Sequence, residues 1–338
     1  MRKFALKTKH IDMKRKLLFA FAAILVSVVM FPASARKDSL KVLYWNIQNG
    51  MWDGQADNYD RFVDWVSSRN PDICVWAEAQ SIYKTGTNVK CAPEDRYLVA
   101  GWKELASRYG HKHIYVGGHR DNYPQVITSK YPIRNVRRFT EETPDTVVTH
   151  GSGWARVNVK GHELNIVTLH TWPLGHAYNI NRNDKEEVKK SAAVNGGDHY
   201  RAMEIEYICR HTILTDKNAA SNLWLMLGDY NSISPADNDV YKLAPDYSSF
   251  LPHKYILANT PYIDSVREHN LPDMQWTIPS HWRYDYLYMS PALDSMVKRI
   301  GVIYEDFTMP VRDEKIRNFF HPSDHLPIEA VIDISRKH

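Results

Sequence analysis

The chain has 338 residues, of which 43% are apolar and 24% charged, so it can bury a sizeable core and disorder throughout is excluded. Its formal net charge of +4 depends on residues 1–35, which hold seven Lys or Arg and one Asp. Without this segment, 36 basic and 38 acidic side chains give a net charge of −2, so composition does not indicate nucleic acid as the partner. Three cysteines, Cys74, Cys91 and Cys209, are too few for a disulfide scaffold, and one bridge between Cys91 and Cys209 stays open.

The N-terminus carries the pattern of a secretory signal. The basic run Lys14-Arg15-Lys16 precedes 15 mostly apolar residues, Leu17–Phe31, and the small residues Ala33-Ser34-Ala35 follow. Because about 20 apolar residues are needed to span a bilayer, this stretch is too short for a transmembrane helix. We predict cleavage after Ala35, with Met13 as an alternative start, and a periplasmic or extracellular protein; a signal anchor is the alternative. Residues 36–338 then form one domain.

The remaining chain alternates between strands and helices, with sheet outweighing helix. Apolar runs predict strands at Leu40–Trp45, Ile73–Ala77, His113–Val116, Gln125–Ser129, Trp154–Val159, Leu164–Leu169, Leu223–Leu227, Tyr284–Met289, Val297–Tyr304 and Leu326–Ile334. Helical spacing predicts helices at residues 62–69, 102–109 and 201–215. The turn Lys160-Gly161-His162 joins two of the strands as a hairpin. Two polar segments, Asn179–Gly197 and Ser232–Asn259, are predicted insertions.

Four of the apolar runs end abruptly in a side chain that binds metal or phosphate well. These side chains are Asn46, Glu78, His170 and Asp229. Because strands of a layered α/β protein bring their carboxyl ends to a common rim, we expect the four to converge on one site. The oxygen ligands of Glu78, Asp229 and Asn231 suit Mg²⁺, Mn²⁺ or Ca²⁺, whereas zinc favours closely spaced Cys or His.

Two further segments add an acid and a base. In Arg283-Tyr284-Asp285-Tyr286, one carboxylate lies inside an aromatic strand, where it is costly unless paired. His325, at the start of the last predicted strand, can be its partner, because a carboxylate fixes the tautomer of an imidazole and raises its basicity. The neighbouring Asp324 is expected to face the same cavity.

Together these motifs resemble the signature of the endonuclease/exonuclease/phosphatase superfamily, which has the deoxyribonuclease I-like fold. The motifs are Trp45-Asn46-Ile47, Ala77-Glu78, Gly228-Asp229-Tyr230-Asn231, Arg283-Tyr284-Asp285-Tyr286 and Ser323-Asp324-His325. Their order and spacing match over nearly all of the mature chain. The segments Thr128–Ile133 and Thr277–Ser280 are similar to those of the secreted bacterial metal-dependent hydrolases in this superfamily. The resemblance implies an α/β fold, a four-layer αββα sandwich of two mixed sheets, with a divalent metal in the cleft between the sheet edges.

The resemblance also implies a role for each site residue. Glu78 would be the principal metal ligand, with Asn46 beside it, and Asp324 would bind or position the metal. Mg²⁺ is the expected ion, with Mn²⁺ or Ca²⁺ possible alternatives on the same oxygen chemistry.

The remaining residues would act on the substrate. Asp229 and Asn231 would hold the phosphate and the attacking water, and His325, oriented by Asp285, would be the general base. His170 would donate a hydrogen bond to the phosphoryl oxygens or protonate the leaving group. This arrangement stabilises the negative charge that attack on a phosphate ester builds up.

Simpler structural roles are open for several of these residues. Asn46 and Asn231 could close turns, Glu78 could be a solvated strand end, and His170 could be a packed core histidine. Pro124-Gln125 stands where the family usually has Gly-Asn, which leaves the substrate class open. Other histidines match no motif and are assigned to the surface or to structural roles: His111, His113, His119 and His176.

The sequence therefore predicts an exported, metal-dependent phosphoesterase that cleaves phosphodiesters in preference to phosphomonoesters. Its substrate could be a small molecule, a lipid headgroup or nucleic acid, and we expect a monomer with no obligate protein partner. A secreted nuclease is the alternative enzyme. A catalytically silent binding module is the alternative from another class, and it predicts the loss of at least one motif residue. None of Glu78, Asp229, Asn231, Asp285 and His325 is lost.

Overall fold

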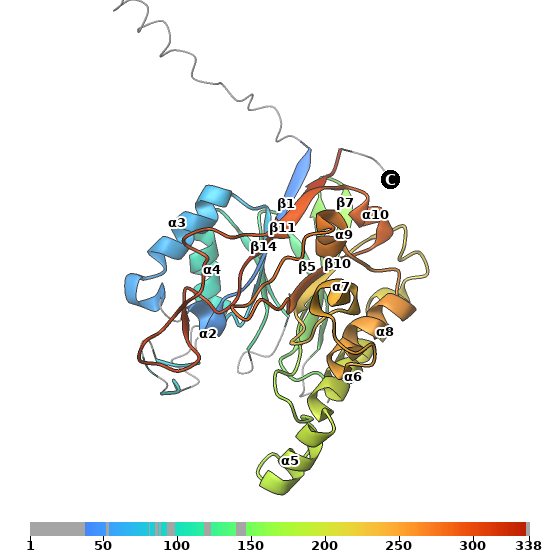
Figure 1. Ribbon diagram of the computed structural model, residues 1–338. Coiled ribbons are helices and arrows are strands. Elements are labelled where there is room, and N and C mark those ends of the chain that lie inside the picture. Colours follow the sequence, from blue (N-terminus) through green and yellow to red (C-terminus); the bar gives the residue numbers. More distant parts are fainter. Residues whose placement is uncertain are drawn as a thin grey trace, which may run out of the picture. The chain divides into compact units, whose positions relative to one another are not determined.

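Figure 1 shows the computed structural model of the chain. It describes residues 38–51, 54–80, 82–84, 87, 89–92, 99–117, 123–139 and 147–335. Residues Leu40–His338 form one compact unit. The predicted signal at residues 1–35 lies outside the described residues, as does His119. None of the described helices combines the length and apolar character needed to cross a membrane.

The described residues contain two six-stranded sheets and a small two-stranded one. The first sheet has the order β11-β14-β1-β2-β4-β3, with bounds β1 Ser39–Asn46, β2 Ile73–Ala77, β3 His113–Val116, β4 Val126–Ser129, β11 Val297–Val302 and β14 Ile328–Asp333. The second has the order β5-β6-β7-β8-β10-β9, with bounds β5 Ile133–Phe139, β6 Ser152–Val159, β7 His162–His170, β8 Leu223–Asp229, β9 Ile263–Asp264 and β10 Asp285–Met289. The third pairs β12 Val311–Arg312 with β13 Phe320–His321. Both large sheets are mixed, because β1 and β2 pair in parallel, as do β7 and β8, beside antiparallel neighbours.

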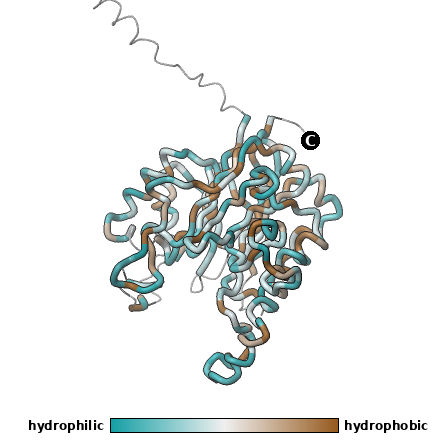
Figure 2. Tube along the Cα trace, in the orientation of Figure 1, coloured by the Kyte–Doolittle hydropathy of each residue, from teal (hydrophilic) through white to brown (hydrophobic). Residues whose placement is uncertain are grey.

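The helices connect these strands and cover the sheets (Figure 1). Their bounds are α2 Gln48–Met51, α3 Asp60–Arg69, α4 Val99–Arg108, α5 Lys185–Ala193, α6 Gly196–Arg210, α7 Asn238–Tyr241, α8 Leu251–Asn259, α9 Ser265–Asn270 and α10 Pro291–Asp294. The short segment α2 is irregular, since Asn49 and Gly50 have positive φ angles of 54° and 68°. Helix α5 has no buried residue, and Figure 2 shows it as a hydrophilic stretch. It lies in the predicted insertion Asn179–Gly197, where Asp184 caps its N-terminus through the backbone N–H groups of Glu186 and Glu187.

Three apolar clusters define four layers. The first cluster lies between the two sheets and joins alternate residues of β1 and β2, such as Val42 and Val75, to residues of the second sheet, such as Ile166 and Leu225. The second packs α3 and α4 on the outer face of the first sheet, and the third packs α6 and α8 on the outer face of the second. Because strand side chains alternate between faces, each sheet buries both of its faces in this way. The prediction of a four-layer αββα sandwich of two mixed sheets is confirmed.

The predicted hairpin forms as expected. Strands β6 and β7 pair antiparallel up to Val159 opposite His162, and the turn residues Lys160 and Gly161 have φ angles of 52° and 93°. Strand β5 was not predicted, because it is an edge strand whose side chains are mostly exposed. The helix predicted at residues 201–215 begins earlier, at Gly196, and ends at Arg210. All three cysteines are free thiols.

His111 has a structural role, and we expect it to make stability depend on pH. Its Nε2 lies 3.0 Å from the Pro71 carbonyl and its Nδ1 2.9 Å from the Thr128 hydroxyl. Burial lowers the pKa of His111 from 6.5 to about 4. Between these values the unfolded chain binds a proton that the folded chain does not, so the free energy of unfolding should fall by about 3 kcal/mol as pH falls through this window.

The measurement is urea unfolding at pH 7 and at pH 4.5. The variant His111→Gln keeps groups that can replace both hydrogen bonds but does not titrate in this range. It should show a smaller loss of stability between the two pH values than the wild type. An equal loss in both proteins would contradict the assignment.

Candidate active site

Five of the predicted site residues lie at neighbouring strand ends. Asn46 ends β1 beside Ala77, the last residue of β2, and Glu78 follows at once. In the second sheet, His170 at the end of β7 is paired with Asp229 at the end of β8, and Asp229 is paired in turn with Asp285 at the start of β10. Strand pairing therefore gathers these side chains at one end of each sheet, and a hydrogen bond from Asn46 to Asp229 joins the two ends.

The carboxylates of Glu78 and Asp229 are joined by Asn46. The Asn46 amide nitrogen donates to Asp229 Oδ2 at 3.0 Å and to Glu78 Oε1 at 3.3 Å. Glu78 also accepts from the backbone N–H of Asn49 at 3.0 Å. Burial raises the pKa of Glu78 to about 7 and that of Asp229 to about 8, and nearby carboxylates act in the same direction. A cation between the two carboxylates would offset both the cost of burying them and the repulsion from nearby carboxylates.

His325 is held by a buried carboxylate. Its Nδ1 lies 2.6 Å from Asp285 Oδ2, while the other Asp285 oxygen accepts from the Tyr44 hydroxyl at 2.7 Å. This contact leaves Nε2 directed at the site, 3.6 Å from Asp229 Oδ2 and 4.0 Å from Asp324 Oδ1. Burial lowers the pKa of His325, but the charges of Asp285, Asp229 and Asp324 outweigh it and raise the pKa well above its ordinary value.

His170 and Asn231 complete the group around Asp229. The Nε2 atom of His170 lies 3.6 Å from Asp229 Oδ2, and burial lowers the pKa of His170 well below its usual value, which favours the neutral form of the ring. The backbone N–H of Asn231 donates to Asp229 Oδ1 at 2.8 Å, and its side-chain amide donates to the Thr171 carbonyl at 3.1 Å. Asn231 has a positive φ of 45°, which turns the chain sharply after β8.

These residues line a cleft of about 310 Å³. Its lining residues are Gln48, Asn49, Glu78, Tyr83, Tyr123, His150, His170, Pro173, Asp229, Asn231, Asn318, Phe319, Asp324 and His325. The Asp324 side chain is 31% exposed, and the prediction that it faces the cavity agrees with this geometry. The structure thus brings together all eight predicted site residues, six of them in the cleft wall and Asn46 and Asp285 behind it.

Comparison with known proteins gives the same architecture. No protein-family model and no curated protein sequence matches the chain. Among solved structures, an AP endonuclease from Archaeoglobus fulgidus aligns with 87% of this chain and 100% of its own, at a TM-score of 0.55 and 17% identity. An endonuclease/exonuclease/phosphatase family protein from Leptotrichia buccalis (TM-score 0.53, 17% identity) and a mannosyl-6-phosphatase from Bacteroides thetaiotaomicron (0.51, 15%) each align with 87% of this chain and 99% of theirs.

The chain has the deoxyribonuclease I-like fold. At 15–17% sequence identity, the similarity to these structures is one of fold.

The donor groups at the rim of this deoxyribonuclease I-like sandwich fit a hard divalent cation. Ligand atoms of Glu78, His170 and Asp229 all lie within 4.8 Å of one another. Asp324 Oδ1 is buried and has no hydrogen-bond partner among the described residues. Carboxylate oxygens of this kind suit Mg²⁺, Mn²⁺ or Ca²⁺. Metal binding by Glu78 and Asp324 stays a prediction, as does binding by Asn46, whose amide oxygen accepts from the Gln48 N–H at 3.2 Å.

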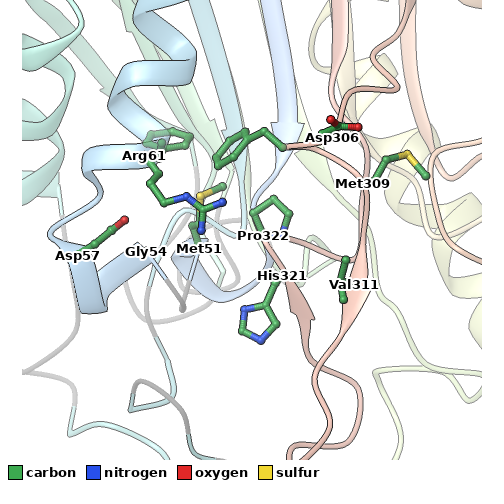
Figure 3. Close-up of a pocket in the computed structure, with 11 residues that line it drawn as sticks. Met51, Gly54, Asp57, Arg61, Asp306, Met309, Val311, His321 and Pro322 are labelled. Carbon is green, nitrogen blue, oxygen red and sulfur yellow. The ribbon is translucent and has the colours of Figure 1, made fainter.

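A second cavity, of about 160 Å³, shares no lining residue with the cleft. Figure 3 shows Arg61, Met51, Pro322 and His321 around it. The Arg61 guanidinium lies over the Phe307 ring at 5.6 Å. This cavity brings none of the predicted site residues together.

Several residues of the site were not predicted. Tyr44 holds Asp285 from the middle of a strand, and its inward direction follows from alternation along β1. Trp45 donates its indole N–H to the His325 carbonyl at 2.7 Å. His150 lies in the cleft wall although no motif surrounds it, and its place there depends on the tertiary fold.

Proposed function

We propose that the protein is a divalent-metal-dependent phosphoesterase that prefers phosphodiesters and uses a histidine to activate water. The observation that carries this proposal is the geometry of His325, whose Nδ1 is held by buried Asp285 while Nε2 faces Asp229 at 3.6 Å in the cleft. The enzymes named among the structural neighbours, an AP endonuclease and a mannosyl-6-phosphatase, support phosphate-ester chemistry on this fold. Export after cleavage at Ala35 remains a prediction.

His325 would take the proton of the attacking water. Asp285 holds the imidazole in one tautomer, and Tyr44 holds Asp285, so the free Nε2 points in a fixed direction. The imidazolium formed after proton transfer is stabilised by the same carboxylate. A positioned base of this kind contributes about 10²- to 10⁴-fold in rate.

His170 and Asn231 would act on the phosphoryl group. In its neutral form the His170 ring can donate one N–H to a phosphoryl oxygen, whereas protonation of the leaving group would need the imidazolium, which the lowered pKa of His170 disfavours. Asp229 and Asn231 would hold the phosphate and the water beside it. A divalent cation, with Mg²⁺ the expected one, would neutralise charge that develops on the non-bridging oxygens.

The proposal predicts hydrolysis that requires a divalent cation. The test uses bis-p-nitrophenyl phosphate, p-nitrophenyl phosphate, sphingomyelin, an inositol phosphate and plasmid DNA, each with Mg²⁺ and with EDTA. We expect faster cleavage of the diester than of the monoester, and loss of activity in EDTA that Mg²⁺ restores. Activity that survives EDTA would contradict the proposed chemistry.

The plasmid DNA assay distinguishes a nuclease from an enzyme that acts on small phosphodiesters. Cleavage by a nuclease depends on contacts to backbone phosphates, so it should fall steeply as the salt concentration rises. Cleavage of the small diester should change little over the same range. The mature net charge of −2 favours the small substrate.

A further inference from the structure

A stack of rings runs outward from the cleft. The imidazoles of His150 and His170 are nearly parallel, with centroids 4.6 Å apart and an interplanar angle of 23°. The Trp172 indole is also nearly parallel to His150, at 5.9 Å and 19°, and the Arg182 guanidinium lies 5.6 Å from the Trp172 ring. Tyr123 is T-shaped to both imidazoles, with ring centroids 5.2 Å from His150 and 6.3 Å from His170. One face of His170 is therefore packed against the His150 ring, and Tyr123 adds a T-shaped contact.

Hydrogen bonds do not set the orientation of His170. A carboxylate holds His325 through Nδ1, but Nδ1 of His170 is buried and has no hydrogen-bond partner in the part of the chain that the structure describes. The Nε2 atom is 3.6 Å from Asp229 Oδ2, too far for a hydrogen bond. Ring packing therefore fixes the plane of His170, and the stack against His150 at 4.6 Å is closer than the T-shaped contact with Tyr123 at 6.3 Å.

Glu204 fixes the backbone on both sides of this stack. It projects from α6, is fully buried, and accepts hydrogen bonds of 2.8 Å from the N–H and the hydroxyl of Thr149 and from the N–H of Trp172. Thr149 precedes His150, and Trp172 follows His170 by two residues. Arg201, one turn earlier on α6, donates to the Trp172 carbonyl at 2.7 Å.

Burying the carboxylate of Glu204 costs free energy, which indicates that this side chain has a specific role. Its neighbours on the buried face of α6 include Ile205 and Ile208, and a charged group in such surroundings loses its hydration. Burial raises the pKa of Glu204 to about 7, although all three hydrogen bonds and Arg201 act in the opposite direction. In return, this single carboxylate links the loop at Thr149 to the loop at Trp172 beside the cleft.

We propose that Glu204 and His150 are positioning residues for His170. Glu204 holds the two loops, and the His150 ring, stacked on His170, keeps that imidazole facing the cleft. The inference rests on the proposed function, because it assigns His170 a part in phosphate-ester hydrolysis.

The test measures kcat and KM with bis-p-nitrophenyl phosphate and Mg²⁺. His150→Ala and Glu204→Gln should each lower kcat by about 10- to 100-fold, the effect of a small displacement of a reacting group, with KM nearly unchanged. His150→Phe retains a flat ring and should restore kcat to within about threefold of the wild type. The matched control is Glu206→Gln, which removes an exposed ion pair with Arg210 on the same helix and should leave both constants unchanged.

A double-mutant cycle separates positioning from a purely structural role. In a His170→Ala background, His150→Ala should have no further effect on kcat, because the residue it positions is gone. An equal loss in both backgrounds would overturn the proposal, as would full activity of His150→Ala in the wild-type background.

NMR of the histidine rings tests the proposal even if no substrate is cleaved. The His170 signals, assigned by comparison with His170→Ala, should shift in His150→Ala and Glu204→Gln but not in Glu206→Gln. Unchanged His170 signals in both of the first two variants would overturn the positioning role. Failure of the wild type to hydrolyse any phosphate ester, with the shifts present, would refute the proposed function instead.

Discussion

Replacing His325 with alanine is expected to lower kcat by about 10²- to 10⁴-fold. The imidazole is the one group in the cleft that a buried carboxylate holds at Nδ1 while Nε2 faces the other site residues, among the residues that the structure describes. Its removal takes away the proton acceptor for water and leaves Asp285 buried with Tyr44 as its remaining side-chain partner. The measurement is steady-state hydrolysis of bis-p-nitrophenyl phosphate in Mg²⁺, as a function of pH.

The pH profile tests the role of the base directly. A general base must be deprotonated, so kcat/KM of the wild type should rise with pH through the pKa of His325, and His325→Ala should lack this rise. The matched control is His321→Ala, four residues earlier, where the side chain is 40% exposed and pairs with Asp313. Its kcat should stay close to that of the wild type. Retention of most of the activity by His325→Ala would refute the assignment.

Replacing Arg283 with methionine is expected to lower the free energy of unfolding by about 3–5 kcal/mol. Arg283 is buried and makes two hydrogen bonds to Asp237 Oδ2, at 3.0 and 2.8 Å, and two to Asp264, at 2.8 and 2.5 Å. Without the guanidinium, both carboxylates lie buried without their main partner. Arg267 lies 3.6 Å from Asp237 Oδ1, but its guanidinium also donates to Asp239 and to the Pro272 carbonyl.

Urea unfolding followed by tryptophan fluorescence measures this loss. Arg210→Met is the control, because Arg210 is 65% exposed and its ion pair with Glu206 should contribute little. Adding Asp237→Asn and Asp264→Asn to Arg283→Met should recover part of the lost stability, since the uncompensated charges are then removed. If Arg283→Met lowered the free energy of unfolding by less than about 1 kcal/mol, the buried ion pairs of Arg283 with Asp237 and Asp264 would not be a source of stability.

The fold could be predicted where local chemistry decides the structure. Alternation and turn residues identified the hairpin around Lys160 and Gly161 because its register depends on adjacent residues. Strand β5 escaped prediction because an edge strand needs no buried face, and Ile133–Phe139 shows no regular alternation. The start of α6 at Gly196 was missed since glycines weaken the helical pattern.

The site residues likewise divide into those that local sequence reveals and those that depend on tertiary packing. Asn46, Glu78 and Asp229 could be predicted because a polar residue directly after an apolar run marks a strand end. His150 and Glu204 could not, because their partners lie on other elements: the stack joins the segment before β6 to the end of β7, and Glu204 reaches both from α6. Such contacts exist only once the second sheet and its helix have packed.

The order of strands in the first sheet has a consequence for biosynthesis. Strand β14 lies between β11 and β1, so the sheet is completed by a segment that the ribosome makes after every other strand of the sandwich. His325 lies three residues before that strand. The segment that carries His325 is therefore anchored only once Ile328–Asp333 has paired with both of its neighbours, so under the proposed function the last step of sheet assembly would also place the base.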